Sequence, residues 1–597
     1  MKTFLKITSA TILATALYGT AQAERAEGGK PDVTASITQG DSEAAKAQNS
    51  SLSGETLPVA AHVLAALGDA REIDEDGDVT EQSLRAFYAG SAASAIWISD
   101  GKPNQKARDA AAEIAKAEQF GMNPNDFKLP AIDTAGDSTE TQAKYELAMT
   151  RALLAFANQA KTGRIHPSKV RHSLNNPTGL EDPRGFLQSL KAGDDVVAVL
   201  RDLHPKHPQF VALQKKLAEL TGANEEKPRV SIPDGPVLKL GESHDHVALL
   251  RKRLEIAGAD SDGSRKFDET VFEAVKAFQK SKGIKQDGIV GNGTRHALNG
   301  ESNEQLKIRI LTNMERWRWL PDNMYGDAKQ YIWSNIPEYR VRIIKNDKFV
   351  FDERMIVGKT NKKTPVFSDA MEWIEIHPVW YVPMSIIVDD IGPSLRRTTS
   401  TVMERYHLQL NCGAHGRDWK KIDWNKVSIR KCSVSQPPGK RSVLGDFKFK
   451  FPNKHIVYMH DTPQKKLFNT TVRTYSHGCM RIRNPRRMAE ILLETDKGMP
   501  ASRLGQILSG PKRPHREDLK KHIPVHVTYF TVTFDAEGNL KTFRDVYAHD
   551  RRLAELLTGK GELLPRPAIA APRKRPPAPR RTRTAGDRQW NNAFSAN

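Results

Sequence analysis

The chain has 597 residues, a net charge of +20 and an isoelectric point of about 9.6. One hydrophobic core cannot serve a chain of this length, so two to four domains are expected. The composition is ordinary for a folded protein, which argues against a wholly disordered or fibrous chain. The excess of positive charge favours acidic partners, such as nucleic acid, anionic lipid or anionic polymers.

The N-terminus has the pattern of a secretory signal. Lys2 and Lys6 precede a short apolar run that ends in Ala-Gln-Ala, which predicts a signal peptide over residues 1–23 with cleavage after Ala23. A membrane anchor is the alternative, but the run is short and is interrupted by Ser and Thr. Residues 24–58 are small and polar and predict a flexible leader. Export would take the chain out of the reducing cytosol, so that a disulfide could persist.

Two helical regions follow the leader. Residues 59–222 place apolar side chains at helical spacing and hold no catalytic constellation, so they predict a helical scaffold domain. Residues 235–300 predict two amphipathic helices, Gly-containing turns and a short third helix. The order of Phe-Gln (278–279), Asp-Gly-Ile-Val-Gly (287–291) and a last helix resembles the peptidoglycan-binding type 1 domain. An unrelated helical linker domain is the alternative.

The pattern then changes from helix to strand. A connecting helix over 301–324 precedes a mostly β domain over 325–550, in which apolar and polar residues alternate. Within it, 384–435 is long, polar and charged, which predicts an inserted lid beside the β core. The Pro-rich tail over 564–597 has eight Lys or Arg and one Asp and predicts disorder. The predicted fold class is therefore multidomain α+β.

The segment TYSHGCMRI (474–482) carries Cys479, one of three cysteines in the chain. A predicted strand ends at His460, nineteen residues earlier, and places Tyr458 on the same face as that histidine. A thiol nucleophile needs a base and oxyanion donors. His460 offers the base, and Gly478 lets the main chain bring amides close to a substrate oxygen.

Three other fates of Cys479 stay open at this point. It could be a buried inert thiol, a zinc ligand together with His460 and His477, or half of a disulfide. For a disulfide, Cys412 and Cys432 make the better pair with each other. They lie twenty residues apart in one insertion, where a crosslink closes a useful loop.

The segment around Cys479 resembles the signature of the L,D-transpeptidases, the YkuD-type family. Further motifs in the same order extend the resemblance over 59–550 and point to the large periplasmic, YcbB-like branch, which also has a helical scaffold and a peptidoglycan-binding module. These motifs are MERWRWLP, NIPEYRV, TPVFSDAMEWIEIHPVWYVPMSI, QPPGKRSVLGDFKFKFPNKHIVYMHDTP and VTYFTVTFDAEGNLKTFRDVYAHD. Many members have Asn two residues after the cysteine, whereas this chain has Arg481, so no role of that Asn is carried over.

The resemblance implies acyl transfer on peptidoglycan stem peptides, with no metal or organic cofactor. Cys479 would attack the carbonyl of meso-diaminopimelate in a tetrapeptide and release D-Ala, and an acceptor diaminopimelate amine would convert the thioester into a 3–3 cross-link. The implied catalytic residues are Cys479 as nucleophile, His460 as general base and acid, and Tyr458 and the Gly478 main chain as oxyanion donors. The implied substrate-binding residues are His477, Arg481, Ser476, Trp380 and Tyr381.

Other functions fit the same residues. Water or a protein amine as acceptor would make the chain an L,D-carboxypeptidase or an enzyme that attaches an outer-membrane protein to peptidoglycan. A vestigial thiol would leave a wall-binding scaffold. The predicted export signal indicates the periplasm, which excludes nucleic acid as the main partner. Carboxylate-rich stem peptides suit the basic charge, and an anionic membrane or other wall-synthesis proteins are further candidates for contact.

Overall fold

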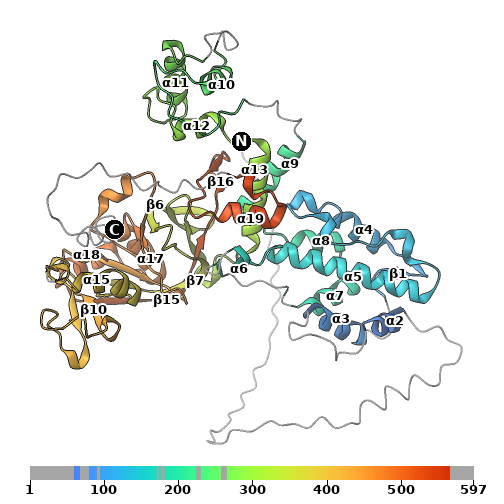
Figure 1. Cartoon of the computed structure of the whole chain (residues 1–597). Coiled ribbons are helices and arrows are strands. Elements are labelled where there is room, and N and C mark those ends of the chain that lie inside the picture. The colour runs from blue at the N-terminus through green and yellow to red at the C-terminus, as the bar shows by residue number, and fades with distance from the viewer. Residues whose placement is uncertain are drawn as a thin grey trace, which may run out of the picture. The chain divides into compact units, whose positions relative to one another are not determined.

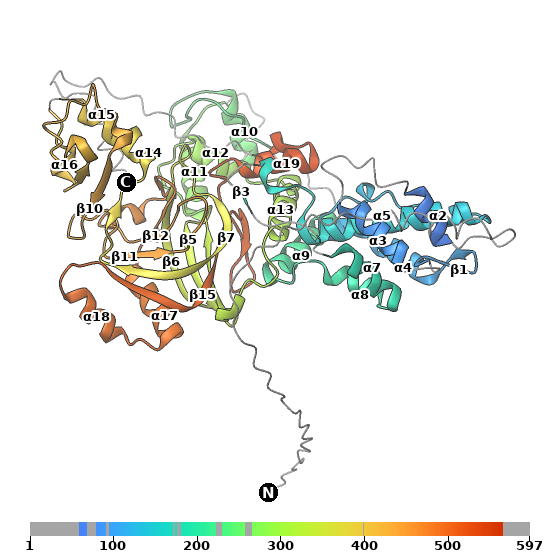
Figure 2. The same cartoon turned by 90° about the horizontal axis from the view of Figure 1, so that it is seen from below.

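The computed structural model of the chain (Figures 1 and 2) describes residues 59–67, 79–90, 95–170, 174–175, 180, 182–222, 230–256, 265–397 and 399–564. The predicted signal peptide and leader lie outside these residues, as does the predicted tail after its first residue. No helix within the described ranges is long and apolar enough to cross a bilayer.

The N-terminal scaffold region is built from helices around one apolar core. Leu153 and Phe156 on the long helix α5 pack there with Phe87 and Trp97. The Ser138 side chain caps the N-terminus of α5 by accepting a main-chain N–H. The helices are α2 (Val59–Ala66), α3 (Val79–Gly90), α4 (Gln105–Ile114), α5 (Thr139–Thr162), α6 (Pro167–Val170), α7 (Pro183–Ala192), α8 (Val196–Asp202) and α9 (Pro208–Gly222), and β1 (Ile98–Ser99) pairs with β2 (Lys102–Pro103).

Helices α10 (Asp245–Arg253), α11 (Glu269–Ser281) and α12 (Asn292–Asn299) form a small unit with its own core (Figure 1). The buried Gln279 amide donates to Asp287 Oδ1 and to the Ile289 carbonyl, both at 3.0 Å, and thereby holds the turn between α11 and α12. Gly288 in that turn has φ +67°, and a Cβ there would lie 2.1 Å from the Phe272 ring. The turn therefore requires glycine, which explains the Phe-Gln and Asp-Gly motif in the sequence.

Helix α13 (Asn303–Arg318), which the sequence predicts as a connector, is part of a core. It begins with a capping box between Ser302 and Gln305. Its Trp317 ring stacks on Phe530 at a centroid distance of 4.4 Å, and the Arg316 guanidinium pairs with buried Asp550 at 2.5 Å. The helix is therefore held by packing and by a buried ion pair.

The mostly β domain predicted over 325–550, called the catalytic domain below for the role that the family resemblance implies, is built around one sheet that closes on itself. Ten of the described strands lie in the order β11-β12-β14-β6-β5-β4-β15-β7-β3, with β13 beside β6, and β11 also pairs with β7. The strands are β3 (Leu174–Asn175), β4 (Gln330–Asn335), β5 (Arg340–Lys345), β6 (Lys348–Gly358), β7 (Val366–Ile376), β11 (Phe447–Lys450), β12 (Met459–His460), β13 (Thr474–Ser476), β14 (Met480–Ile482) and β15 (His515–Thr528). The pairing of β11 with β7 makes the sheet barrel-like. β3 comes from the segment after α6, within the predicted scaffold range.

Helices complete the catalytic domain outside the closed sheet. Met488 and Leu492 of α17 (Pro485–Lys497) and Leu504 of α18 (Ala501–Ser509) belong to the same core as the sheet's apolar side chains, and Figure 2 shows both helices beside β15. After the hairpin of β16 (Val532–Phe534) and β17 (Leu540–Thr542), α19 (His549–Thr558) adds Leu553 to that core. The predicted domain limit at 550 thus falls inside α19.

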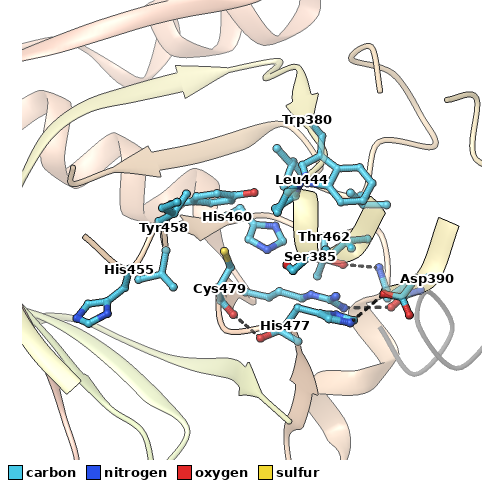
Figure 3. Close-up of a pocket in the computed structure, with 18 of the residues that line it drawn as sticks. Trp380, Ser385, Asp390, Leu444, His455, Tyr458, His460, Thr462, His477 and Cys479 are labelled. Atoms are coloured by element: carbon cyan, nitrogen blue, oxygen red, sulfur yellow. Dashed lines mark hydrogen bonds and ion pairs between the residues drawn. The ribbon is translucent and has the colours of Figure 1, made fainter. Parts of the chain in front are cut away.

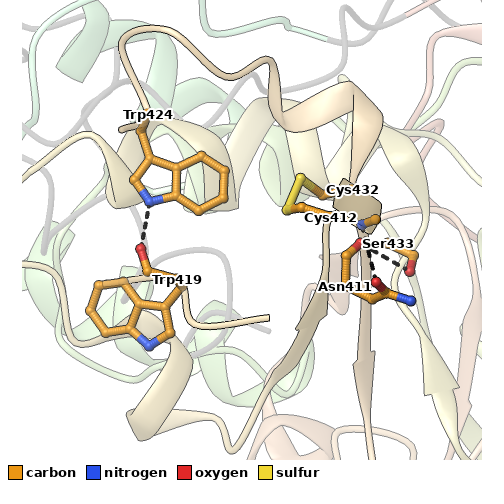
Figure 4. The surroundings of a disulfide bond; sticks show 7 residues. Asn411, Cys412, Trp419, Trp424, Cys432 and Ser433 are labelled. Carbon is orange, nitrogen blue, oxygen red and sulfur yellow. Dashed lines mark hydrogen bonds between the residues drawn. A yellow bond between two sulfur atoms is a disulfide. The ribbon is translucent and has the colours of Figure 1, made fainter. Parts of the chain in front are cut away.

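The predicted insertion is a small subdomain with a core of its own. It contains α14 (Met384–Ile386), a π-helix (Ile387–Ile391), α15 (Gly392–Leu395), α16 (Val402–Arg405) and a three-stranded sheet of β8 (Trp380–Tyr381), β10 (Ser433–Gln436) and β9 (Gln409–Asn411). Cys412 and Cys432 form the disulfide that the sequence predicts, near Trp424 (Figure 4). Because β8 pairs with β10, the subdomain begins and ends slightly outside 384–435.

Candidate active site

Paired strands bring the predicted catalytic residues together. β12 and β14 are parallel neighbours, and their register sets His460 opposite Arg481. Two residues before this pair, Tyr458 lies beside Cys479, where the Met480 N–H donates to the Tyr458 carbonyl at 3.0 Å. Strand pairing therefore explains why a histidine and a cysteine that are nineteen residues apart can share one site.

A cavity of about 390 Å³ lies beside Tyr458, His460 and Cys479, with walls from both the lid and the catalytic domain (Figure 3). The lid contributes Trp380, Pro383, Met384, Ser385, Ile386 and Asp390. The catalytic domain contributes Val443, Leu444, His455, Ile456, Val457, Tyr458, His460, Thr462, Pro463, Gln464, Ser476, His477, Cys479 and Arg481. The cavity therefore combines an apolar wall with a cluster of polar and charged groups, which is typical of small-molecule sites.

Tyr458 is the neighbour that most favours the Cys479 thiolate. Its main chain and its hydroxyl both act to lower the pKa of the thiol, and the Trp380 side chain acts in the same direction on the Tyr458 hydroxyl. Burial has the larger effect and raises the pKa of the Cys479 thiol, although Tyr458 and the positive charges of Arg481 and Lys450 act in the opposite direction. Burial also raises the pKa of Tyr458 well above its usual range, so its hydroxyl stays protonated as a donor.

The His460 imidazole is held in one tautomer. Its Nδ1 lies 2.5 Å from the Asp461 carbonyl, so Nδ1–H donates and Nε2 keeps a free lone pair. Burial, followed by the charge of Arg481, lowers the pKa of His460 to about 3. A neutral imidazole is therefore the resting form, and it can accept a proton from the neutral thiol.

The polar groups of the loop before Cys479 form hydrogen bonds that fix the conformation of that loop. Gly478 has φ +116°, its carbonyl accepts from Thr364 Oγ1 at 2.8 Å, and its N–H donates to Ser476 Oγ at 3.1 Å. Ser476 Oγ donates to the Cys479 carbonyl at 2.5 Å. In this structure the Gly478 N–H and the Ser476 hydroxyl are therefore engaged within the loop, although Ser476 also lines the cavity. Their roles as oxyanion donor and substrate-binding residue stay predictions.

Arg481 is a buried cation with few partners. Its side chain is 8% exposed, Nη1 donates to Gln464 Oε1 at 3.2 Å, and Nε has no hydrogen-bond partner among the described residues. No carboxylate in the described ranges forms an ion pair with it, and burial lowers its pKa to about 10. The guanidinium therefore has unused capacity for an anion at the cavity.

Two acidic residues of the lid contact the nucleophile loop and the loop after β6. His477 Nε2 lies 3.3 Å from Asp390 Oδ2 on the π-helix (Figure 3). The next acidic residue on that helix, Asp389, pairs with Lys362 Nζ at 2.7 Å. His477 thus lines the cavity as predicted but contacts the lid, and π-helices often mark functional segments.

The two aromatic residues that were predicted to bind substrate, Trp380 and Tyr381, differ in their position relative to the cavity. Trp380 is buried and lines the cavity, whereas Tyr381 is 74% exposed and is not among the cavity-lining residues. Successive strand residues point to opposite faces, so Tyr381 lies outside the cavity and its role in substrate binding stays a prediction. In the described part of the chain no three His, Cys, Asp or Glu side chains are placed to share a metal ion, so the zinc alternative finds no support.

Sequence reasoning missed several residues of the site. Asp390 lies in a charged insertion without periodicity, so nothing in the sequence singled it out. Lys450 belongs to the alternating segment Phe-Lys-Phe-Lys-Phe (447–451), and that alternation was the one signal that could have placed it beside the site. Thr364 and Gln464 carry no local signal, because they reach the site only through the fold.

Three family models match the chain. One described as an L,D-transpeptidase catalytic domain matches residues 329–501, a "Putative peptidoglycan binding domain" matches 243–298, and a scaffold domain matches 82–217. The chain carries a YkuD-type L,D-transpeptidase catalytic domain. The other two matches fall within the predicted scaffold and peptidoglycan-binding regions, and the resemblance seen in the sequence is confirmed.

Individual relatives match parts of the chain. A Haemophilus influenzae protein named "Putative L,D-transpeptidase" is 29% identical over 254 residues, which are 42% of this chain and 50% of the relative. The N-acetylmuramoyl-L-alanine amidase CwlL of Bacillus licheniformis is 39% identical over 101 residues, which are 15% of this chain and 28% of the relative. The chain thus spans half or less of the length of these curated relatives.

Solved structures add little at this level of similarity. An L,D-transpeptidase from Xylanimonas cellulosilytica is 14% identical, covers 50% of this chain and 99% of its own, and has a TM-score of 0.15. An L,D-transpeptidase from Stackebrandtia nassauensis is 13% identical, covers 50% of this chain and 96% of its own, and scores 0.14. Scores this low carry no argument about the fold.

Proposed function

We propose that the chain is a peptidoglycan L,D-transpeptidase that forms 3–3 cross-links between meso-diaminopimelate residues through a thioester on Cys479. The strongest support is the strand register that sets Tyr458 beside Cys479, at a cavity that His460 and Arg481 also line. The catalytic and peptidoglycan-binding domain matches support peptidoglycan as the substrate.

In the first half-reaction, Cys479 Sγ forms a bond to the diaminopimelate carbonyl carbon of a tetrapeptide, while the thiol proton passes to His460 Nε2. The carbonyl oxygen becomes an oxyanion, and the Tyr458 hydroxyl is the candidate donor to it. The C–N bond to D-Ala then breaks, and His460 returns its proton to the leaving amine. A thioester and free D-Ala result.

In the second half-reaction, the side-chain amine of an acceptor diaminopimelate attacks the thioester carbonyl. The new C–N bond forms, the C–S bond breaks, and the proton lost by the amine returns to the sulfur through His460. Because the pKa of His460 is lowered to about 3, the imidazole holds this proton only briefly. The resting thiol and neutral imidazole are then restored.

Arg481 is the candidate for binding a carboxylate of the stem peptide. Its guanidinium has one neutral partner, Gln464, whose replacement by a carboxylate would give a charge-assisted, bidentate contact. His477 and Asp390 would join the lid to the nucleophile loop around the bound peptide. In this proposal Trp380 aligns the Tyr458 hydroxyl.

The location follows from the same domains. Domains that act on peptidoglycan imply an extracytoplasmic place for the chain. The periplasm, reached through the predicted signal peptide, is the proposed compartment. We also propose peripheral contact with an anionic membrane or other wall-synthesis proteins, because the net charge of +20 favours anionic partners.

Incubation of the purified protein with disaccharide-tetrapeptide muropeptides tests the proposal. A 3–3 cross-linked dimer is expected by mass spectrometry. Tripeptide products without dimer would indicate an L,D-carboxypeptidase, and no turnover would indicate a wall-binding scaffold. The matched control is Cys479→Ala, which should lose turnover but still sediment with isolated sacculi.

A further inference from the structure

Two rows of side chains cross the sheet and end at the site. Antiparallel β11 sets Lys448 opposite His460, so the same register sets Lys450 opposite Tyr458. On the other side of β11, β7 continues both rows. The first, here called the thiol row, is Trp373–Lys450–Tyr458–Cys479. The second, here called the imidazole row, is Glu375–Lys448–His460–Arg481. Residues in such a row share one face of the sheet.

The two lysines differ in their charge partners. Lys448 Nζ lies 3.1 Å from Glu375 Oε2, so its charge is compensated. Lys450 forms no ion pair with any carboxylate in the described ranges. Its Nζ lies 5.8 Å from the Trp373 ring centroid and 5.6 Å from that of Tyr458, a ring that Lys448 Nζ also approaches, to 5.1 Å. Aromatic rings stabilise a cation there without neutralising it.

We infer that Lys450 is a positioning residue of the nucleophile, because its ammonium lies in the thiol row, pairs directly with no carboxylate of the described residues, and stabilises the Cys479 thiolate. A positive charge near a half-buried sulfur acts through a medium of low effective dielectric, where it counts for more than in water. The inference rests on the proposed function only in taking Cys479 as the nucleophile.

The charges around the sulfur come from several elements. Arg481 lies on β14, His460 on β12, His477 in the preceding loop, and Asp390 on the lid. Arg481 lowers the pKa of Cys479 more than Lys450 does, and both oppose the effect of burial. Loss of Lys450 should therefore weaken thiolate formation without abolishing it.

The pH dependence of Cys479 alkylation by iodoacetamide in the full chain measures this effect. Cys412 and Cys432 do not react under non-reducing conditions, because they form a disulfide. In Lys450→Met the alkylation midpoint should rise by about 0.5–1 pH unit. Lys450→Arg should restore the wild-type midpoint, because the charge is kept. Lys448→Met is the matched control and should leave the midpoint in place.

An unchanged midpoint in Lys450→Met, or an equal rise in Lys448→Met, would overturn the inference. Near-ultraviolet circular dichroism checks that each variant is folded, and Lys450→Gln serves as a second neutral variant if Lys450→Met does not fold. Alkylation needs no peptidoglycan, so failure of the transpeptidase proposal would leave this test intact.

Discussion

The scaffold and the catalytic domain both bury charged side chains, but they use them differently. In the scaffold, Glu146 on α5 accepts from the Tyr88 hydroxyl at 2.9 Å and from the N–H groups of Ile96 and Trp97 at 2.7 and 2.9 Å. In the catalytic domain, Arg481 is almost as buried but has one neutral partner and lines a cavity. The first arrangement satisfies the charged group within the fold, whereas the second leaves the guanidinium with hydrogen-bonding capacity for the proposed stem-peptide carboxylate.

Two buried histidines sharpen this comparison. In the scaffold, His204 stacks on Phe120 at 3.9 Å, and neither ring nitrogen has a hydrogen-bond partner among the described residues. Burial lowers its pKa to about 2, as burial lowers that of His460 to about 3. A depressed pKa is therefore no mark of a catalytic base. The oriented hydrogen bond and the cavity distinguish His460.

The largest expected effect separates these histidines by activity. His460→Gln and Cys479→Ala should each lower cross-linking by about a thousandfold or more, because each removes a reacting group. His204→Phe should keep turnover, since His204 and the Phe120 and Phe156 rings beside it do not line the Cys479 cavity. Muropeptide turnover by the three folded variants is the measurement. Equal losses of turnover in His204→Phe and His460→Gln would contradict the distinction between a structural His204 and a catalytic His460.

The next effect is on stability in acid. His204, His207, His460 and His526 have pKa values of about 2, 4, 3 and 4, lowered by burial. Below about pH 6.5 these histidines become protonated in the unfolded chain but stay neutral in the folded chain. The free energy of unfolding therefore falls as the pH is lowered from about 6.5 to about 4. The slope contributed by each histidine is about 1.4 kcal/mol per pH unit.

Urea unfolding at several pH values between 7.5 and 4.5 checks this prediction. His204→Phe should flatten the dependence of stability on pH, because it removes one group that is protonated only in the unfolded chain. The new phenyl ring can still stack on Phe120. A slope that is unchanged from wild type would show that His204 is already protonated in the folded state.

A smaller effect concerns the lid and its disulfide. Cys412 and Cys432 close a loop across a sequence separation of twenty residues, so the Cys412→Ser, Cys432→Ser double variant should lose about 2–4 kcal/mol of lid stability. Proteolysis of the lid should accelerate, whereas the closed sheet should unfold at an unchanged denaturant midpoint. Thiol counting in the denatured, unreduced wild type should find one free thiol, and three would contradict the pairing.

The smallest effect is at the rim of the cavity. Ile456 lines it, is 72% exposed and has φ +57°, which is unfavourable for a β-branched residue. Ile456→Gly should raise the free energy of unfolding by about 0.5–1 kcal/mol. The exposed Lys329, with φ +53°, is the matched control, and Lys329→Gly should give a similar gain by urea unfolding. A loss of stability in Ile456→Gly would contradict the strain.

Local patterns predicted much of the fold and site. Strand alternation placed Tyr458 and His460 on one face, and the spacing of the cysteines predicted the disulfide. The closure of β11 onto β7, the addition of β3 and the approach of Asp390 to His477 depend on contacts between distant segments, which no local pattern encodes. The hydrogen bond from the Gly478 amide to Ser476 could not be predicted either, because it depends on the loop conformation.

The central claim is that Cys479 carries the acyl group. Intact-protein mass spectrometry after brief incubation with a tetrapeptide donor, without acceptor, tests it most directly. We expect a hydroxylamine-labile tripeptide adduct that maps to the peptide containing Cys479 and is missing from Cys479→Ala. Release of D-Ala with no adduct on that peptide, or an adduct that persists in Cys479→Ala, would show that Cys479 does not carry the acyl group.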